Sequence, residues 1–317
     1  MSKVKLYRIH PQVDRTGGLA QKFPKLLQEA GLADIVKQGD LVAVKMHFGE
    51  PGNLRYTRPA FPVMVVDALL ELGAKPFVTD TAVLYKSPRH HAWDYYLAAK
   101  RHGFTSEVLG CPLIIAGGMT DLSVKVKVPG AKRLQEVGIA QEIYDADVLI
   151  SLAHVTLHLQ YPLGASIKNV AMGCADIPTK TAMHDIRTTK PRLVGQYQAT
   201  MDVAKAVLSG FEKKFFGINL LLDVTPDCDC WNKSDVPIVP DLGILAGTDP
   251  NGLDQASYDL ITAAPGYPGS KLDGTDGAVA GGNKVTPIYP NIDCKAYFDI
   301  ANQSKLGNPD YEIVTIS

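Results

Sequence analysis

Short apolar runs alternate with amphipathic segments through the first half of the chain, and this alternation constrains the fold more than any other feature. Residues 42–48 form an apolar run that ends in a turn rich in Gly and Pro, and residues 59–72 then carry apolar side chains at helical spacing until Gly73. Residues 76–80 form the next strand-like run. Strand–helix–strand units of this length predict parallel strands joined by right-handed crossovers.

The rest of the chain continues the alternation. Further strands are predicted at residues 1–9, 113–116, 147–154, 215–224, 242–247 and 311–316, and further helices at residues 93–102, 134–144 and 197–212. The run at 147–154 is almost continuously apolar, as expected where helices cover both faces of a parallel sheet. The sequence therefore predicts an α/β fold with a mostly parallel sheet and helices on both faces. Residues 263–290 are dense in Gly and Pro and predict a surface arm near the C-terminus.

The length of the chain leaves its domain organisation open. A chain of 317 residues fits a single α/β unit over residues 1–317. It also fits two lobes, at about residues 1–190 and 191–317, with a cleft between them. The Gly/Pro-rich arm is a candidate contact with a second subunit, so a homo-oligomer is one of the predicted states.

The charge balance argues against two classes of partner. The chain has 32 basic and 33 acidic residues, a formal net charge of -1, and both signs spread along its length. A nucleic-acid-binding surface needs a basic patch or stripe. No apolar run approaches the ~20 residues that span a bilayer, and the N-terminal residues lack the apolar core of a signal peptide. Five cysteines are too few for a disulfide framework in a chain this long. We therefore expect a cytoplasmic protein with neither a nucleic-acid nor a membrane partner.

Ionisable residues stand where four of the predicted strands end. His47, Asp80 and His154 close three of them, and Asp223 closes the fourth. A single polar residue in such a position is often a turn residue. In an open α/β sheet, however, the carboxyl ends of the strands line the crevice where ligands bind. His47 and Asp80 are therefore predicted to bind a cofactor or ligand, and His154 is a candidate catalytic residue.

Residues 154–184 hold the densest group of reactive side chains. They include His154, His158, Lys168, Asn169 and His184. Lys168 lies in a mostly apolar stretch, and burial lowers the pKa of a lysine, so it is a candidate base, Schiff-base former or anion clamp. The alternative is a lysine that extends to solvent. The three histidines and Lys168 are candidate catalytic residues, and Lys168 with Asn169 is predicted to bind a cofactor.

The cysteines Cys228 and Cys230 form a short Cys-x-Cys pair that packing does not readily explain. Cys174 is a candidate third sulfur, and His184 is a candidate fourth ligand. Zinc and iron–sulfur sites take about four ligands, mostly thiolate or imidazole. The pattern predicts an iron–sulfur cluster or a single metal ion, with zinc favoured over nickel. The alternative for Cys174 is that it behaves as a small buried hydrophobe, as most free cysteines do.

Several phrases of the sequence resemble the domain of unknown function 362 family, whose members are described as uncharacterised iron–sulfur centre proteins. The resemblance is carried by residues 47–50 (HFGE), 167–174 (IKNVAMGC), 223–230 (DVTPDCDC) and 240–246 (PDLGILA). Many members carry a ferredoxin-like insert with cysteine-rich cluster motifs, but residues 188–198 contain no cysteine here. The resemblance implies a metal- or iron–sulfur-binding protein with a redox or small-molecule role. It also implies that any cluster would use the three cysteines discussed above.

A fainter resemblance concerns the spacing of three residues. His158, Lys168 and His184 lie ten and then sixteen residues apart, with Gly164 and Gly173 on either side of the lysine. This spacing is similar to that of the nickel-pincer lactate racemase family. The resemblance implies that Lys168 anchors the pincer nucleotide, that His184 ligates nickel and that His158 transfers a proton.

Three hypotheses about function follow from the sequence. The first is a metal- or iron–sulfur-binding α/β protein with a redox partner or a small-molecule ligand. The second is an enzyme of racemase or isomerase type that uses histidine and lysine acid–base chemistry on a carboxylate substrate. The third is a binding module in which the cysteines hold a structural zinc ion.

Overall fold

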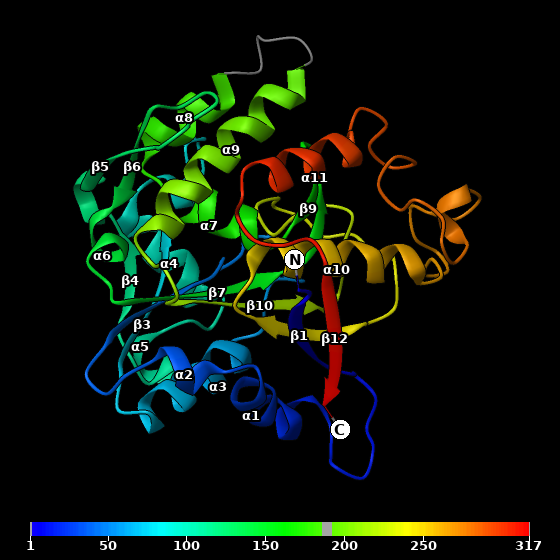
Figure 1. The fold of residues 1–317 in the computed structure, drawn as a ribbon, viewed down its shortest axis with the longest axis horizontal. Coiled ribbons are helices and arrows are strands. Elements are labelled where there is room, and N and C mark those ends of the chain that lie inside the picture. The colour runs from blue at the N-terminus through cyan, green and yellow to red at the C-terminus, as the bar shows by residue number, and fades with distance from the viewer. Residues whose placement is uncertain (1, 186–191, 317) are drawn as a thin grey trace.

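A computed structural model describes residues 2–185 and 192–316, and an eight-stranded sheet runs through its centre (Figure 1). The strand order is β12-β1-β11-β10-β7-β2-β3-β4. These strands are β1 (Val4–Ile9), β2 (Leu41–Lys45), β3 (Lys75–Thr81), β4 (Leu113–Ala116), β7 (Val148–His154), β10 (Phe215–Leu221), β11 (Gly243–Gly247) and β12 (Tyr311–Ile316). Two small antiparallel hairpins pair β5 (Ser123–Lys127) with β6 (Glu136–Ala140) and β8 (Thr156–His158) with β9 (Tyr161–Gly164).

All strands of the central sheet except one point in the same direction. Strands β10, β7, β2, β3 and β4 pair in parallel with their neighbours, and so do β1 and β12. Strand β11 alone runs antiparallel to both of its neighbours, β10 and β1. The prediction of a mostly parallel sheet is therefore confirmed, and the carboxyl ends of the parallel strands meet along one edge.

Helices cover both faces of this sheet, as predicted. They are α1 (Leu19–Glu29), α2 (Leu32–Ile35), α3 (Ala60–Glu71), α4 (Ala92–Arg101), α5 (Ser106–Leu109), α6 (Gln141–Tyr144), α7 (Ser166–Cys174), α8 (Ile177–Asp185), α9 (Arg192–Ser209), α10 (Pro250–Ala263) and α11 (Cys294–Gln303). Strand β2 shows why two layers form, since successive side chains of a strand point to opposite faces. Val42 and Val44 pack in the core between the sheet and α1, α3 and α4. Ala43 packs in the core on the other side, between the sheet and α7 and α9 (Figure 1).

The predicted helix at residues 134–144 is wrong over most of its length. Residues Glu136–Ala140 form strand β6, and only Gln141–Tyr144 are helical. Within β6, the side chains of Val137 and Ile139 are buried in the core. Between them, a Cβ atom on Gly138 would lie 1.8 Å from the Asp176 carboxylate, so the strand depends on the absence of a side chain there. Pairing with β5 therefore overrides the local helical pattern.

The C-terminal part of the chain adds strands to the same sheet and carries the Gly/Pro-rich segment. Residues 264–290 form an extended loop with one short 3-10 helix at Asp276–Ala278, and this loop projects beside α10 in Figure 1. The predicted boundary between two lobes, near residue 190, falls within residues 186–191, which lie outside the described residues. The lobes, the homo-oligomer and the role of the arm stay predictions. The position expected for the ferredoxin-like insert also falls partly within residues 186–191.

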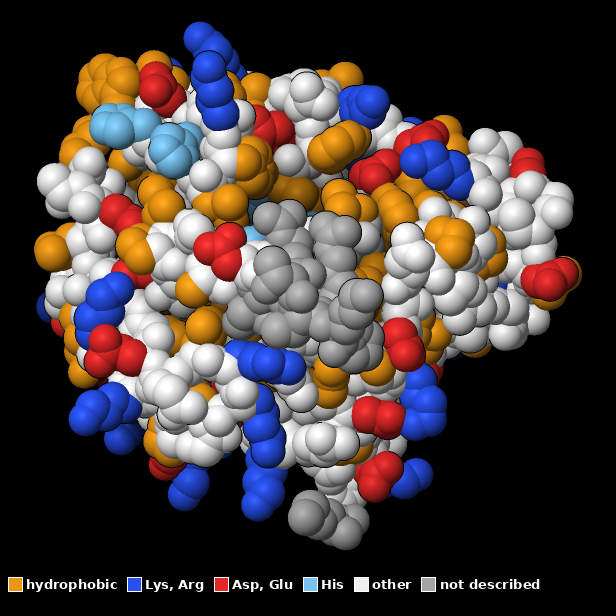
Figure 2. Space-filling view, turned by 90° about the horizontal axis from the view of Figure 1, so that it is seen from above, with side chains coloured by type: hydrophobic (Ala, Val, Ile, Leu, Met, Phe, Trp, Pro, Cys, Tyr) orange, Lys and Arg blue, Asp and Glu red, His pale blue; other side chains and the backbone are white. Residues whose placement is uncertain are grey.

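Two further observations concern possible membrane and nucleic-acid partners. Among the described residues, no helix combines the length and the apolar character that crossing a bilayer requires. Basic and acidic side chains are interspersed on the face shown in Figure 2. The exclusion of nucleic acid stays a prediction from the charge pattern.

Candidate functional site

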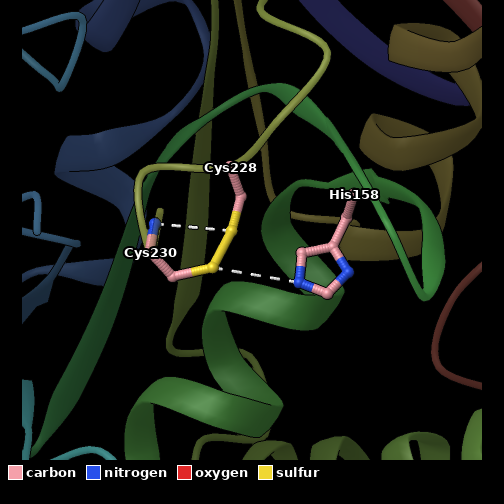
Figure 3. A group of neighbouring side chains, drawn as sticks. All are labelled: His158, Cys228 and Cys230. Carbon is pink, nitrogen blue, oxygen red and sulfur yellow. Dashed lines mark hydrogen bonds between the residues drawn. A yellow bond between two sulfur atoms is a disulfide. The ribbon is translucent and has the colours of Figure 1, made fainter. Parts of the chain in front are cut away.

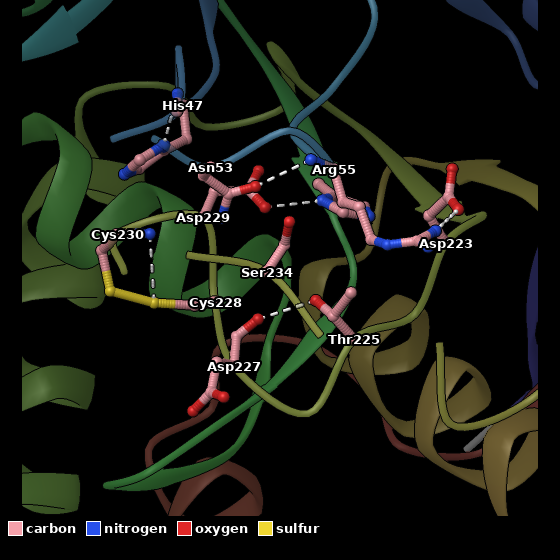
Figure 4. Close-up of polar contacts among 12 residues, drawn as sticks. His47, Asn53, Arg55, Asp223, Thr225, Asp227, Cys228, Asp229, Cys230 and Ser234 are labelled. Atoms are coloured by element: carbon pink, nitrogen blue, oxygen red, sulfur yellow. Dashed lines mark hydrogen bonds and ion pairs between the residues drawn. A yellow bond between two sulfur atoms is a disulfide. The ribbon is translucent and has the colours of Figure 1, made fainter. Parts of the chain in front are cut away.

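A cavity of about 400 Å³ lies beyond the carboxyl ends of β2, β3 and β7. Most of the side chains singled out in the sequence line it, namely His47, Asp80, His154, His158, Lys168, Asn169, His184, Cys228 and Cys230. Asp223 does not line it. Its carboxylate instead forms ion pairs with Arg55 and Arg58, at 2.9 and 2.6 Å (Figure 4). Strand ends and the segment after β7 thus form the walls of a single cavity, as expected for ligand sites in α/β sheets.

A buried ion pair forms the floor of the cavity. Lys45, the last residue of β2, places its Nζ 3.1 Å from Asp80 Oδ1 and 2.7 Å from Asn169 Oδ1. The Asn169 amide also donates to the Ser151 hydroxyl at 2.9 Å, and Tyr95 donates to the second Asp80 oxygen. Asp80 and Asn169 therefore form their hydrogen bonds with Lys45 and with neighbouring protein groups. These contacts fix the shape of the cavity floor.

Arg89 forms a second buried pair beside His47. Its Nε donates to Glu50 Oε2 at 2.7 Å, and its Nη1 lies 2.8 Å from His47 Nε2. The Gly49 amide donates a hydrogen bond to His47 Nδ1 at 2.9 Å. A neutral imidazole can accept at only one of its nitrogens, so Nε2 then carries the ring proton and faces Arg89 without accepting from it. Burial, with the positive charge of Arg89, lowers the pKa of His47 well below its usual value. His47 is therefore a neutral imidazole at pH 7.

His154 and Asp229 form a third pair. His154 Nδ1 lies 2.8 Å from Asp229 Oδ1, and His154 Nε2 lies 2.8 Å from the Leu222 carbonyl oxygen, which can only accept. Burial by itself would lower the pKa of His154, but the Asp229 carboxylate raises it. Both ring nitrogens are used, so His154 positions Asp229 rather than contacting a ligand. The other carboxylate oxygen, Asp229 Oδ2, is buried and has no partner among the residues that the structure describes.

Two lysines reach the cavity without a carboxylate partner in the described part of the chain. Lys168, on α7, places its Nζ 5.9 Å from the centroid of the Tyr161 ring. Burial and the nearby Lys45 charge lower its pKa to about 8. Lys180, on α8, donates to Thr81 Oγ1 at 2.6 Å and to the Ala82 carbonyl, and burial lowers its pKa to about 8 as well. Neither amine forms an ion pair with a described residue, although Asp80 acts on both from a longer distance.

The Cys-x-Cys pair lies on the opposite wall, close to His158 (Figure 3). A disulfide joins Cys228 to Cys230, and His158 Nε2 lies 4.0 Å from the Cys230 sulfur. Potential ligand atoms of these three residues lie within 4.8 Å of one another. Burial, followed by the Lys168 charge, lowers the pKa of His158 well below its usual value, so its ring is neutral. The hairpin β8–β9 brings His158 to this position.

Cys174 and His184 lie outside this group of three. Cys174 ends α7 with its side chain fully buried in the core, and burial raises the pKa of its thiol to about 12. His184 Nδ1 lies 2.7 Å from the carbonyl oxygen of Lys180 on α8, and its side chain faces the cavity. In the described residues, the predicted four-ligand set is therefore replaced by two sulfurs and the imidazole of His158.

The loop that carries the cysteines is held by the loop that follows β2 (Figure 4). The Glu50 amide donates to the Asp229 carbonyl at 2.8 Å, and Asn53 Nδ2 donates to the Trp231 carbonyl at 3.2 Å. Gly52 makes the approach possible, because a Cβ atom there would lie 2.4 Å from a backbone oxygen of the facing loop and its φ is +99°. Residues 47–53 and 223–230, which carried much of the family resemblance, are thus packed against each other.

The comparison with protein families matches these same segments. The model of the family described as Domain of unknown function (DUF362) matches residues 42–259. The chain belongs to the DUF362 family. The predicted family resemblance is therefore confirmed, and the matched region contains every residue that lines the cavity.

The individual proteins similar to this chain share low sequence identity with it. A Thylakoid-associated protein, sll1697, from Synechocystis is 26% identical over 185 residues, which cover 56% of this chain and 52% of the relative. The chain therefore spans about half the length of this curated relative. The lactate racemase apoprotein from Thermoanaerobacterium thermosaccharolyticum has a TM-score of 0.47 at 11% identity, covering 69% of this chain and 51% of that one. A Thermotoga maritima protein has a TM-score of 0.41 at 12% identity, with 71% and 56% covered.

Two charged residues that line the cavity, Lys45 and Lys180, were given no role on the basis of the sequence. Lys45 has a readable signal, because a lysine inside an otherwise apolar strand must be paired when the strand is buried. Lys180 has none, since its burial depends on α8 bringing its side chain to Thr81 at the end of β3, which no local pattern shows.

Proposed function

We propose that this chain is an enzyme of racemase or isomerase type that binds a small carboxylate in the cavity and uses Lys168 as its acid–base residue. The observation that carries the proposal is the Lys168 amine, which faces the cavity without a hydrogen bond or ion pair among the described residues. An amine with a pKa of about 8 is partly neutral near pH 7 and can both take up and return a proton.

The charge of the cavity supports an anionic substrate. Lys45, Arg89 and His154 each have a carboxylate partner of their own, so their charges are compensated within the protein. Lys168 and Lys180 have none within ion-pair distance in the described ranges. Uncompensated charge in a partly buried site is costly, and a bound carboxylate relieves that cost.

The two lysines are suited to different tasks. Lys180 is held by Thr81 and by a backbone carbonyl, so its charge is fixed in place and can orient the substrate carboxylate. Lys168 is free to move a proton at the carbon next to that carboxylate. Asp229 Oδ2, which is buried and unpartnered, can accept a hydrogen bond from a substrate hydroxyl or amino group. A 2-hydroxy or 2-amino carboxylate matches these three positions.

The metal-site predictions have less support than the racemase or isomerase proposal. An iron–sulfur cluster takes about four cysteine ligands, whereas Cys111, Cys174 and Cys294 are buried elsewhere and only Cys228 and Cys230 reach the cavity. The cluster therefore does not fit the described residues. A single zinc or nickel ion could be held by Cys228, Cys230 and His158 only after the disulfide is reduced, since thiolates are the metal ligands. No step of the proposed reaction passes through it.

Exchange of the substrate α-proton tests the proposal. A panel of small 2-hydroxy and 2-amino carboxylates is incubated with the protein in D₂O, and the loss of the α-proton signal is followed by NMR. Binding of each compound is measured by calorimetry. We expect Lys168→Met to abolish the exchange and to weaken binding by about tenfold or more, the worth of one charge-assisted contact.

The control is Lys100→Met, since Lys100 is an exposed residue of α4 and its loss should change neither measurement. Exchange that survives in Lys168→Met, or binding of the panel that is the same in both variants, contradicts the proposal.

A further inference from the structure

The disulfide between Cys228 and Cys230 forms part of the cavity wall. Cys230 is partly exposed to the cavity, whereas Cys228 is buried behind it. We propose that this pair is redox-active and exchanges with small dithiols and disulfides that enter the cavity. This activity is separate from the carboxylate chemistry of Lys168 and does not depend on it.

Position in the chain separates this pair from the other cysteines. Cys111, Cys174 and Cys294 are free thiols, and all three are buried in the core. Burial raises the pKa of Cys111 to about 11 and that of Cys174 to about 12, which keeps both unreactive. The linked pair lines this cavity, and a volume of about 400 Å³ accommodates a small molecule. The exchange partner is therefore a small thiol compound rather than a folded protein.

The loop is built to keep the two sulfurs in place when the bond between them opens. The Trp231 amide donates to the Cys228 carbonyl at 3.0 Å, which closes a turn around the pair. The Asn53 amide and the backbone amide of Glu50 hold the same turn from outside. His154 holds Asp229, which lies between the two cysteines. These contacts involve no sulfur, so they persist in the reduced protein.

Each sulfur has a hydrogen-bond donor of its own. The Cys230 amide contacts the Cys228 sulfur at 3.4 Å. His158 Nδ1 accepts from the Gln160 amide at 3.0 Å, so its neutral ring carries the proton on Nε2. That Nε2 lies 4.0 Å from the Cys230 sulfur (Figure 3). Hydrogen-bond donors at these positions stabilise the thiolate form of each cysteine. The thiolate is both the attacking and the leaving group in thiol–disulfide exchange.

The reaction is a two-electron exchange. A thiolate of the dithiol attacks the Cys230 sulfur, the Cys228–Cys230 bond breaks, and Cys228 leaves as a thiolate beside the Cys230 amide. The second thiol of the reductant then attacks its own sulfur in the mixed disulfide and releases Cys230. The dithiol is oxidised to a disulfide, the protein pair is reduced, and the two protons of the dithiol pass to the two cysteines. A small disulfide reverses these steps.

The experiment uses the native chain, with dithiothreitol as the dithiol and 2-hydroxyethyl disulfide as the oxidant. We expect dithiothreitol to expose Cys228 and Cys230 to iodoacetamide, with the three buried cysteines left unlabelled, as read by peptide mass. Subsequent addition of 2-hydroxyethyl disulfide should restore the bond.

Single-cysteine variants test the asymmetry between the two sulfurs. In Cys228→Ser, the remaining Cys230 should form a mixed disulfide with 2-hydroxyethyl disulfide. In Cys230→Ser, the more buried Cys228 should react at least about tenfold more slowly. His158→Phe should slow the release of Cys230 from the mixed disulfide by about tenfold, since one donor to the leaving sulfur is lost. Cys111→Ser is the matched control and should behave as the unmodified chain.

Two results would overturn the proposal. One is that dithiothreitol and 2-hydroxyethyl disulfide fail to interconvert the reduced and oxidised cysteine pair in the native protein. The other is a reduced pair that takes up one equivalent of zinc and then resists both reagents, because that behaviour assigns the cysteines to a metal site. Neither result affects the α-proton exchange expected of Lys168.

Discussion

Two polar groups of side chains meet helix α7, and they differ in how completely their hydrogen bonds are made. At the start of the helix, the Asp254 carboxylate accepts from the amides of Ser166 and Ile167 at 2.8 and 3.0 Å. The side chain of Asn219 also donates to Asp254, at 3.2 Å, and accepts from the Ser166 hydroxyl at 2.8 Å. Every member of this network is buried and has a partner.

The second group lies farther along the same helix and is incomplete. Lys168 Nζ has neither a hydrogen bond nor an ion pair in the described ranges, and Asp229 Oδ2 is buried without a partner. Buried polar groups are almost always satisfied in folded proteins, so the exceptions call for an explanation. The complete network therefore holds the start of α7 in place, whereas the incomplete group keeps polar atoms without a partner among the described residues.

The largest expected effect concerns the complete network. Asp254→Ala should lower the free energy of unfolding by about 3–5 kcal/mol, because it leaves buried amides at the start of α7 and the Asn219 amide without an acceptor. Chemical denaturation measures the change. Asp67→Ala, at an exposed position of α3, is the control and should change the free energy by less than about 0.5 kcal/mol. Equal stability of the two variants would contradict the view that the Asp254 network holds α7 in place.

A smaller effect is expected where α7 passes the buried Lys45. A Cβ atom on Gly173 would lie 1.7 Å from Lys45 Cε, and Lys45 cannot move aside without losing Asp80 and Asn169. Gly173→Ala should therefore cost about 1–3 kcal/mol of stability, as overpacking does. Thermal unfolding checks this against Gly210→Ala, where the nearest atom would lie at 3.4 Å. A Gly173→Ala protein as stable as the control would show that this wall of the cavity can adapt.

The smallest effect concerns the pH dependence of binding at the incomplete group. Lys168 and Lys180 have pKa values of about 8, so each is protonated below pH 8 and neutral above it. Affinity for a carboxylate should be highest below pH 8 and should fall by about tenfold for each titrating lysine between pH 7 and pH 9. Calorimetry over this range measures the decrease. Lys168→Arg should make the decrease shallower, because arginine keeps its charge, and an unchanged profile would remove Lys168 from the binding site.

The sequence was informative about the strands and about the residues at their ends. Apolar runs predicted β2, β3, β7 and β10, and right-handed parallel connections then placed His47, Asp80 and His154 at one edge. The sequence-based prediction was wrong at residues 134–144, where pairing with β5 decides the conformation. A local pattern of residues does not show which strand will pair with the segment.

The limits of the site prediction have a similar cause. Cys174 and Gly173 are neighbours in the sequence, but the helix turns Cys174 into the core and leaves Gly173 against Lys45. His158 reaches Cys230 because the hairpin β8–β9 returns the chain across the cavity, which no spacing along the chain encodes.

The sequence by itself determined the α/β class, the family and most of the reactive residues, since periodicity and residue type are local properties. Only the tertiary structure decided which charges are compensated. It paired Lys45, Arg89 and His154 with carboxylates, whereas Lys168 and Lys180 form no ion pair with any residue of the described ranges. It also joined Cys228 to Cys230 beside His158. Such pairings depend on distances of a few ångströms between segments far apart in the chain, and these distances are fixed by packing rather than by sequence neighbours.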